Sequence, residues 1–317
     1  MAAPQDEAPS GIGMGEAGAI AVPLREGRQL PADNSATGIL LMVAAMMVVP
    51  FMDAIAKHLS DRYAISQIVW ARFFFHFAIL APIVLYTYRG RALRPRQPVL
   101  QVVRGGFLLA ATVLFFAAIA TMPIADALAL LFVSPMVVTA LSPVLLGEKV
   151  GIRRWLAVIV GFFGALIILR PGLGVVQTGS LLALGAGCVF AFYALATRKL
   201  SGSAPPLVTL AYTAVLGAGL MSLAVVPDWR PPPAGDLALM AAIGAIAAAG
   251  HFLLIRAFDY APASLLAPYS YSEIVMATAI SYVWFSDFPD GWTWVGIVVI
   301  VGSGIYISWR ERQTKAT

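Results

Sequence analysis

The sequence predicts an all-α integral membrane protein with ten transmembrane helices, arranged as two inverted five-helix repeats. Hydrophobic residues make up 60% of the chain and charged residues 12%, whereas a soluble domain carries roughly 25% charged residues. The apolar residues fall into continuous blocks close to the ~20 residues with which a helix crosses a bilayer. Continuous blocks of this length indicate helices, because a transmembrane barrel would show alternation in segments of about ten residues. Part of the second half also resembles part of the first at a fixed distance along the chain.

Ten apolar blocks follow one another, mostly with short connections, so we expect neighbouring helices to be antiparallel. Their expected bounds are residues 36–58, 66–88, 99–121, 125–146, 153–170, 178–198, 206–226, 236–257, 262–285 and 292–309. The expected domain organisation is a disordered cytoplasmic tail over 1–35, a first repeat over 36–172, a second repeat over 173–310 and a cytoplasmic tail over 311–317.

The distribution of basic residues predicts the orientation in the membrane. With a cytoplasmic N-terminus and ten spans, 16 of the 21 Lys and Arg residues fall on the inner side, and this set includes Arg104. Only Lys57, Arg62, Arg170 and Arg230 fall on the outer side, in agreement with the positive-inside rule. We therefore expect a multi-pass protein of the bacterial-type inner membrane with both termini in the cytoplasm. Because the basic residues lie in loops, no nucleic-acid partner is expected.

An internal repeat links the two halves. Residues 112–170 can be laid on residues 251–309 without a gap, at an offset of 139 positions, and ten of the 59 positions are identical. The identical pairs include Pro123 with Pro262, Ser142 with Ser281 and Trp155 with Trp294. Five helices per half is an odd number, so the second half enters the membrane inverted. Inverted repeats are typical of alternating access, with the substrate near the midplane between the repeats.

Glu273 is the candidate residue for ion coupling or substrate recognition. It lies about 11 residues, or roughly 16 Å, from either end of the block 262–285. A carboxylate at this depth costs on the order of 2–4 kcal/mol to insert, so it normally faces a cavity or a partner. We expect it to take up a proton or to bind a cationic group; the alternative is a buried acid that a neighbouring Ser, Tyr or basic residue satisfies. Ser134 occupies the equivalent position of the first repeat.

Arg72, His76 and Asp53 form a second candidate group. Arg72 and His76 are one turn apart on the second helix and share a face. Counting along the helices places Asp53 close to Arg72 in depth and His76 near the depth of Glu273. An Asp53–Arg72 pair would remove two uncompensated charges from lipid. The pair is either a structural clamp between the first two helices, or an outer gate or anion-binding site for a substrate carboxylate or phosphate.

Three further residues are candidates for lining a substrate site. His251 lies toward the inner end of the eighth helix, where it lines a cavity or is a satisfied packing residue. Tyr269 and Tyr271 flank Glu273 in sequence and are suited to stacking on a planar ligand, although each alone is more often a packing residue.

Several functional classes lack their sequence signatures. No GxxxxGK[ST] phosphate loop and no HExxH or CxxC metal set occurs, so we expect neither ATP-driven transport in this chain, nor a metal, nor another cofactor. The single cysteine, Cys188, precludes an intramolecular disulfide. The candidate polar residues are spread over the membrane midplane and both ends. A membrane-embedded enzyme acting on a lipid would need them clustered at one interface.

The sequence resembles the drug/metabolite transporter superfamily, and within it the ten-helix EamA family. The resemblance rests on QIVWARFFF at 67–75, on Arg104-Gly105-Gly106, and on the long run from Ala127 to Gly172. That run contains Gly147-Glu148-Lys149 and Gly161-Phe162-Phe163-Gly164. The second half departs from the pattern with Ser286-Asp287-Phe288. The resemblance covers residues 36–309 and implies ten helices around a central cavity and secondary transport of small metabolites.

These observations together favour a secondary active transporter of a small metabolite, coupled to H⁺ or Na⁺ and working by alternating access. We favour export. The nearest alternative is import, as in relatives that take up S-adenosylmethionine or riboflavin; a membrane-embedded lipid enzyme and a channel are alternatives from other classes. The expected partners are the small-molecule substrate and the lipid bilayer, and a homodimer is left open.

Overall fold

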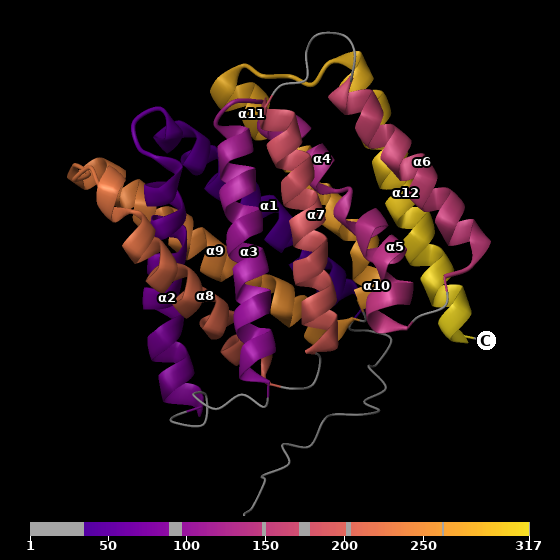
Figure 1. Cartoon of the computed structure of the whole chain (residues 1–317), viewed down its shortest axis with the longest axis horizontal. Helices are drawn as coiled ribbons and strands as arrows, with labels where there is room; N and C mark the ends of the chain where they lie inside the picture. The colour runs from indigo at the N-terminus through magenta and orange to yellow at the C-terminus, as the bar shows by residue number, and fades with distance from the viewer. Residues whose placement is uncertain are drawn as a thin grey trace, which may run out of the picture.

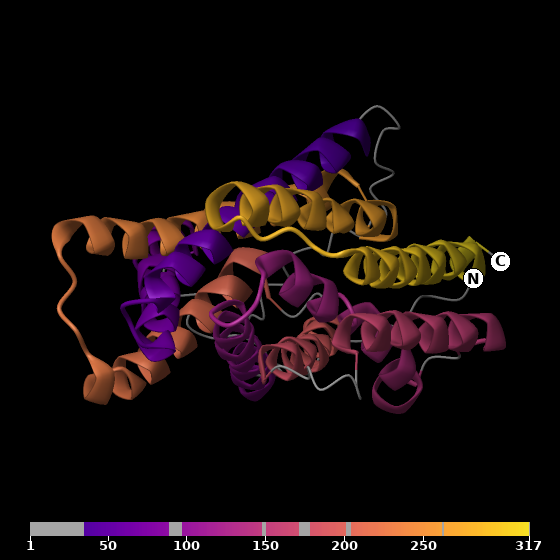
Figure 2. The ribbon, with the colours of Figure 1, turned by 90° about the horizontal axis from the view of Figure 1, so that it is seen from above.

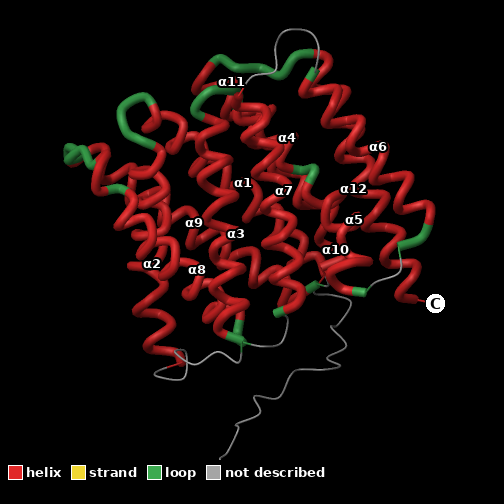
Figure 3. Tube along the Cα trace, viewed as in Figure 1, coloured by secondary structure: helices red, strands yellow, loops and turns green. Residues whose placement is uncertain are grey.

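A computed structural model describes residues 35–88, 97–147, 150–170, 178–200, 204–261 and 263–316. Within these ranges the regular structure is helical throughout (Figure 3). The expected tail over 1–35 lies outside the described residues except for Ser35, where the first helix begins. The helices are α1 (Ser35–Ser60), α2 (Ile65–Tyr88), α3 (Pro98–Ile119), α4 (Ile124–Leu131), α5 (Ser134–Leu146), α6 (Ile152–Leu169), α7 (Thr178–Lys199), α8 (Pro206–Ala224), η3 (Val226–Asp228), α9 (Ala234–Tyr260), α10 (Ala263–Leu266), η4 (Ala267–Tyr271), α11 (Ser272–Phe285) and α12 (Gly291–Ala316).

Nine segments of the described chain are long and apolar enough to cross a membrane, and α4 with α5 counts as one of them. They correspond to nine of the ten expected blocks. The tenth block, expected as one continuous helix over 262–285, is instead divided into α10, η4 and α11. This corrects the sequence-based expectation for that segment. The all-helical fold with two repeats of transmembrane helices is confirmed.

The fourth span is interrupted at Phe132 and Val133, between α4 and α5. Pro135 follows this interruption and has no N–H to donate to the carbonyl of Leu131, so a regular helical bond is missing there. In the ninth span, η4 ends at Tyr271, which is 139 positions after Phe132. The two interruptions therefore lie at equivalent positions of the two repeats, and both precede the helix that begins at Ser134 or at Ser272.

The two repeats are intertwined. Helix α1 packs along α9, and its counterpart in the second repeat, α7, packs along α3 of the first repeat. Helix α2 packs against its counterpart α8, and α6 packs against its counterpart α12. The last pair stands at one side of the bundle, where both views show α6 and α12 running side by side (Figures 1 and 2). The repeats thus share one framework rather than forming two separate bundles.

Close backbone contacts at glycines repeat with the same symmetry. Thr37-Gly38 near the start of α1 aligns with Thr178-Gly179 of α7 at an offset of 141 positions. A Cβ on Gly38 would lie 3.2 Å from the carbonyl oxygen of Ala257, and a Cβ on Gly179 would lie 3.3 Å from that of Ala118. Ala118 and Ala257 are equivalent at the offset of 139. The inverted repeat therefore governs how helices pack as well as where they begin.

A second glycine pair supports the same conclusion. Gly105 on α3 and Gly244 on α9 are equivalent at the offset of 139. A Cβ on Gly105 would lie 2.9 Å from the Leu216 side chain, and a Cβ on Gly244 would lie 2.4 Å from that of Phe75. Phe75 and Leu216 are equivalent at the offset of 141. Small residues at such crossings let transmembrane helices approach closely.

Candidate functional site

Asp53 on α1 and Arg72 on α2 lie buried in the interior, with 2% and 5% of their surfaces exposed. Arg72 donates from Nη1 to the Thr112 hydroxyl on α3 at 3.1 Å. Asp53 and Arg72 attract one another electrostatically. Among the described residues, however, no ion pair within 4.0 Å joins them. Asp53 Oδ1 and Arg72 Nε have no hydrogen-bond partner, so these two buried charges do not pair directly.

His76 and His251 lie next to each other although they come from α2 and α9. Their ring centroids are 5.5 Å apart and their ring planes are inclined by 34°. His251 donates from Nδ1 to the Ala247 carbonyl at 2.7 Å, because a carbonyl oxygen only accepts. His76 Nε2 is buried and has no partner. The structure thus brings together two candidate residues that sequence analysis had treated separately.

Glu273 lies in the first turn of α11, directly after the interruption of the ninth span. Helix α11 packs on α1, and the Glu273 carboxylate interacts electrostatically with Asp53. Within the described part of the chain, Glu273 makes no hydrogen bond and no ion pair. We call Asp53, Arg72, His76, Thr112, His251 and Glu273 the buried polar cluster. It contains two carboxyl groups and one guanidinium, so one negative charge is not balanced within it when both acids are ionised.

The two candidate tyrosines have different surroundings. Tyr271 is buried, and its ring centroid lies 4.9 Å from that of Phe132. Its hydroxyl lies against Gly304 of α12, where a Cβ would come within 1.7 Å of the oxygen. Tyr269 is 38% exposed. Tyr271 therefore packs between the repeats, whereas Tyr269 is the accessible ring of the two.

Arg104 was not singled out by sequence analysis, which counted it among the inner basic residues and in a family motif. The structure places it inside α3, 3% exposed. It donates to the Thr197 hydroxyl at 2.6 Å, the Thr213 hydroxyl at 2.8 Å, the Thr209 carbonyl at 3.3 Å and the Tyr193 hydroxyl at 2.7 Å. Arg104 therefore joins α3 to α7 and α8. Its position within the apolar block 99–121 was the feature of the sequence that could have identified it as a buried cation.

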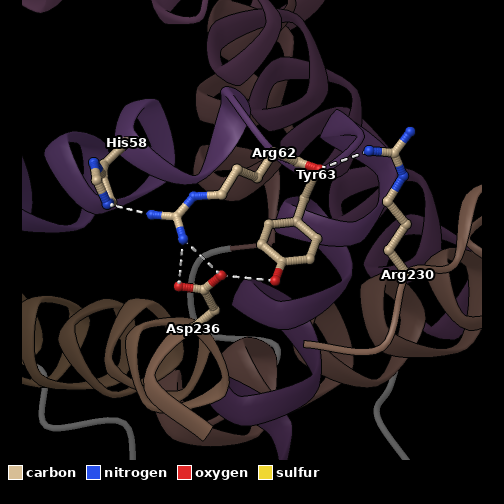
Figure 4. Close-up of polar contacts among 5 residues, drawn as sticks. All are labelled: His58, Arg62, Tyr63, Arg230 and Asp236. Carbon is tan, nitrogen blue, oxygen red and sulfur yellow. Dashed lines mark hydrogen bonds and ion pairs between the residues drawn. The ribbon is translucent and has the colours of Figure 1, made fainter. Parts of the chain in front are cut away.

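The end of the bundle at which α1, α6 and α11 finish, hereafter the far end, is held by ion pairs between the repeats (Figure 1). Arg62, after α1, binds both carboxylate oxygens of Asp236 on α9 at 3.1 and 3.2 Å (Figure 4). Tyr63 donates to the same carboxylate at 2.7 Å, and this hydrogen bond raises the pKa of the Tyr63 hydroxyl. Arg62 also donates to His58 Nε2 at 2.9 Å, and Arg230 donates to the Arg62 carbonyl at 3.2 Å.

Two further contacts close the far end. Lys57 donates to the Met122 carbonyl at 2.8 Å and pairs with Asp287 at 3.1 Å. Arg170 pairs with Asp290, and this hydrogen bond, with one from the Thr293 N–H, lowers the pKa of Asp290 to about 2. Lys57, Arg62, Arg170 and Arg230 are the four outer cations of the sequence analysis. Each is engaged at the far end with a residue of the other repeat.

A polar pocket of about 450 Å³ opens beside this network. It is lined by the loop from Ser60 to Ala64 and by the stretch from Pro227 to Arg230. Gln67 holds that stretch in place, since its side-chain amide exchanges two hydrogen bonds with the backbone of Arg230 at 2.8 and 3.0 Å. The pocket therefore belongs to the loops of the far end rather than to the buried polar cluster.

A comparison with known protein families identifies the family of this chain, and the match covers both repeats. The EamA-like transporter family matches residues 36–170 and 177–309. The chain belongs to this family. Transport across a membrane is the family's function, and the chain is accordingly a multi-pass protein of the bacterial inner membrane.

Named relatives of this family align over almost their whole length. The chain is 27% identical over 280 residues to the S-adenosylmethionine uptake transporter of Rickettsia prowazekii (strain Madrid E), covering 88% of this chain and 95% of that protein. It is 28% identical over 283 residues to a riboflavin transporter of Vibrio cholerae, with 88% and 95% covered. It is 29% identical over 280 residues to the pseudopaline exporter CntI of Pseudomonas aeruginosa, with 86% and 96% covered.

A solved structure shares the fold. Its TM-score is 0.62 at 20% sequence identity, with 86% of this chain and 97% of that chain covered. At this identity the likeness supports the arrangement of the helices and carries no information on the transported compound.

Proposed function

We propose that the protein is a secondary transporter that moves a small metabolite across the inner membrane by alternating access. The observation that carries this proposal is the pairing of equivalent contacts between inverted repeats, seen at Gly38 with Gly179 and at Gly105 with Gly244. A framework with this symmetry has two related ways of closing, one toward each side of the membrane. We also propose that both termini are cytoplasmic, so that the far end faces outward.

Glu273 is proposed to couple transport to an ion or to bind a cationic group of the substrate. Three features support this role: it has no partner within the described chain, it interacts electrostatically with Asp53, and it lies in the first turn of the helix that follows the interruption at η4. Two interacting carboxylates at this depth favour binding of a proton, Na⁺ or an organic cation. The reason is that the two negative charges repel each other, and a bound cation neutralises one of them. Asp53 and Arg72 are proposed to orient this site from α1 and α2.

Export is the proposed direction, with import as the second candidate. The named relatives include both an uptake transporter and an exporter, so relatedness alone favours neither. Transport is favoured over catalysis on a lipid substrate, because the buried polar cluster lies between helices of both repeats rather than at one membrane interface.

Purified protein in liposomes tests these proposals. We would measure uptake of radiolabelled S-adenosylmethionine, riboflavin and amino acids, with and without an imposed pH gradient or Na⁺ gradient. Gradient-driven accumulation that is lost in Glu273→Gln, but kept in Val275→Ala on the exposed face of the same helix, is the expected result. Gradient-dependent accumulation that persists in Glu273→Gln would exclude the coupling role. Saturable exchange unaffected by any gradient would exclude coupling altogether.

A further inference from the structure

Four polar groups in the buried polar cluster lack partners. Asp53 Oδ1, Arg72 Nε and His76 Nε2 are buried atoms without a hydrogen bond. Their residues are 2%, 5% and 4% exposed. Glu273 makes no hydrogen bond within the described ranges. Buried polar groups are almost always hydrogen-bonded, so the three unpartnered buried atoms, with the Glu273 carboxyl group, point to a ligand.

The opposite charges of the cluster are held apart rather than paired. Thr112 fixes one nitrogen of the Arg72 guanidinium and leaves Nε unused. Asp53 on α1 interacts electrostatically both with Arg72 on α2 and with Glu273 on α11, the helix that packs on α1. The cluster therefore offers one cation and two carboxylates, with Asp53 interacting with both of the others. A ligand that complements these charges carries an anionic group and a cationic group a short distance apart.

We propose, on the basis of the transport function proposed above, that the buried polar cluster recognises a zwitterion. The carboxylate of the substrate binds Arg72, whose free Nε edge suits a planar carboxylate. Its ammonium or sulfonium group lies between Asp53 and Glu273. Each charge of the substrate then meets an opposite charge of the protein, and one negative charge remains. That remaining charge is the one that a coupled proton or Na⁺ neutralises.

Two sets of matched compounds test this inference. One set is L-phenylalanine, phenethylamine and 3-phenylpropionate; the other is L-methionine, 3-(methylthio)propylamine and 4-(methylthio)butanoate. Within each set the side group is constant, while the compound is zwitterionic, cationic or anionic. Binding to the purified full-length chain would be followed by thermal shift, because a ligand of the folded state raises the melting temperature.

The expected result is a saturable shift with a zwitterion of at least one set, and apparent affinities about tenfold or more weaker for the two singly charged compounds. Glu273→Gln should lose the discrimination between the zwitterion and its anionic analogue. Arg72→Lys keeps the positive charge but loses the two parallel N–H donors of the guanidinium. It should therefore weaken binding of the zwitterion far more than binding of the cation. Val275→Ala serves as the control, since its side chain is exposed on the same helix as Glu273.

Arg72 is buried, so its variants could fail to fold. Thr112→Val is therefore included, because it releases the guanidinium without removing a charge. Equal shifts by the amine and the zwitterion would overturn the role of Arg72. The inference would be overturned if neither zwitterion raised the melting temperature while the protein transported riboflavin in liposomes. The proposed transport function would then still hold. No transport of any compound by a folded protein would instead overturn the proposed function.

Discussion

Phe132 and Tyr271 lie against each other with ring centroids 4.9 Å apart, although 139 residues separate them in the chain. Each sits at the interruption of its span, and each is the other's counterpart in the repeat. The two aromatic rings therefore join the irregular points of both repeats.

The contact of Tyr271 with α12 predicts an unequal effect of two glycine substitutions. A Cβ on Gly304 would come within 1.7 Å of the Tyr271 hydroxyl oxygen, whereas nothing lies within 4 Å of a Cβ on Gly302. Gly304→Ala should destabilise the protein by about 1–3 kcal/mol through overpacking. Gly302→Ala should have no comparable cost. Thermal unfolding in detergent measures both, and combining Gly304→Ala with Tyr271→Phe should restore part of the loss; equal effects of the two alanines would contradict this contact.

The contacts of Lys57 predict that removing its charge makes the far end open more often. Lys57 joins α1 to the Met122 carbonyl and to Asp287, and is therefore one of the contacts that hold the two repeats together at this end. Lys57→Met should expose the far end more often, since Met retains much of the side-chain bulk without the charge. A cysteine introduced as Ser60→Cys, in a Cys188→Ser background, should then react faster with a membrane-impermeant maleimide. The exposed Lys199→Met variant is the control, and unchanged labelling in Lys57→Met would show that this residue does not hold the far end closed.

The Arg170–Asp290 pair predicts a contribution to stability that depends on pH. The pKa of Asp290 is lowered to about 2 from an ordinary value of 3.8. A lowered carboxyl pKa stabilises the fold above the ordinary value, and this stabilisation is lost as the pH falls toward the lowered value. The melting temperatures of wild type and Asp290→Asn should therefore differ constantly from pH 7 to 5 and converge between about pH 4 and 2.

The size of this effect should be small. About half of the Asp290 side chain is exposed, so solvent screening limits the pair to roughly 1 kcal/mol or less. Asparagine can still accept the hydrogen bond from the Thr293 N–H, so the comparison isolates the charge. A difference that grew on acidification would contradict the assignment.

The hydrogen bonds of Arg104 predict that the stability of the protein depends on the hydroxyl groups that accept them. All three of its side-chain nitrogens donate to residues of α7 or α8. Thr197→Val and Thr213→Val should each cost about 1–3 kcal/mol, because each leaves a buried donor of a charged group unpaired. Arg104→Lys should cost at least as much, because an ammonium cannot reproduce the planar fork. Denaturation in mild detergent measures these costs, and near-neutral threonine variants would indicate that water replaces the hydroxyls.

Much of the fold follows from the sequence because the bilayer imposes it. Without water in the hydrocarbon region, the backbone must satisfy its own hydrogen bonds, so each apolar block of sufficient length becomes helical. The repeat was visible in residues 112–170 and 251–309, where equivalent helix ends align. Glu273 was also identifiable from sequence, because an acid in the middle of a membrane-length block is costly wherever its helix lies.

The arrangement of the site depended on the tertiary structure. The apolar blocks are hydrophobic on all sides, so no periodicity tells which face of a helix meets which neighbour. The proximity of His76 to His251 and the clamp around Arg104 both depend on that choice. The division of the ninth span into α10, η4 and α11 also emerged only in the packed molecule.

The sequence by itself determined that this chain is a membrane protein of helical repeats with an acid in the middle of its ninth apolar block. Composition and block length are enough for this conclusion, because an apolar block of sufficient length forms a membrane-spanning helix whichever residues lie next to it. Only the tertiary structure decided that Asp53 interacts electrostatically with Arg72 and with Glu273 while forming an ion pair with neither. Contacts between residues far apart in the chain depend on helix rotation and crossing, which packing against the other repeat sets.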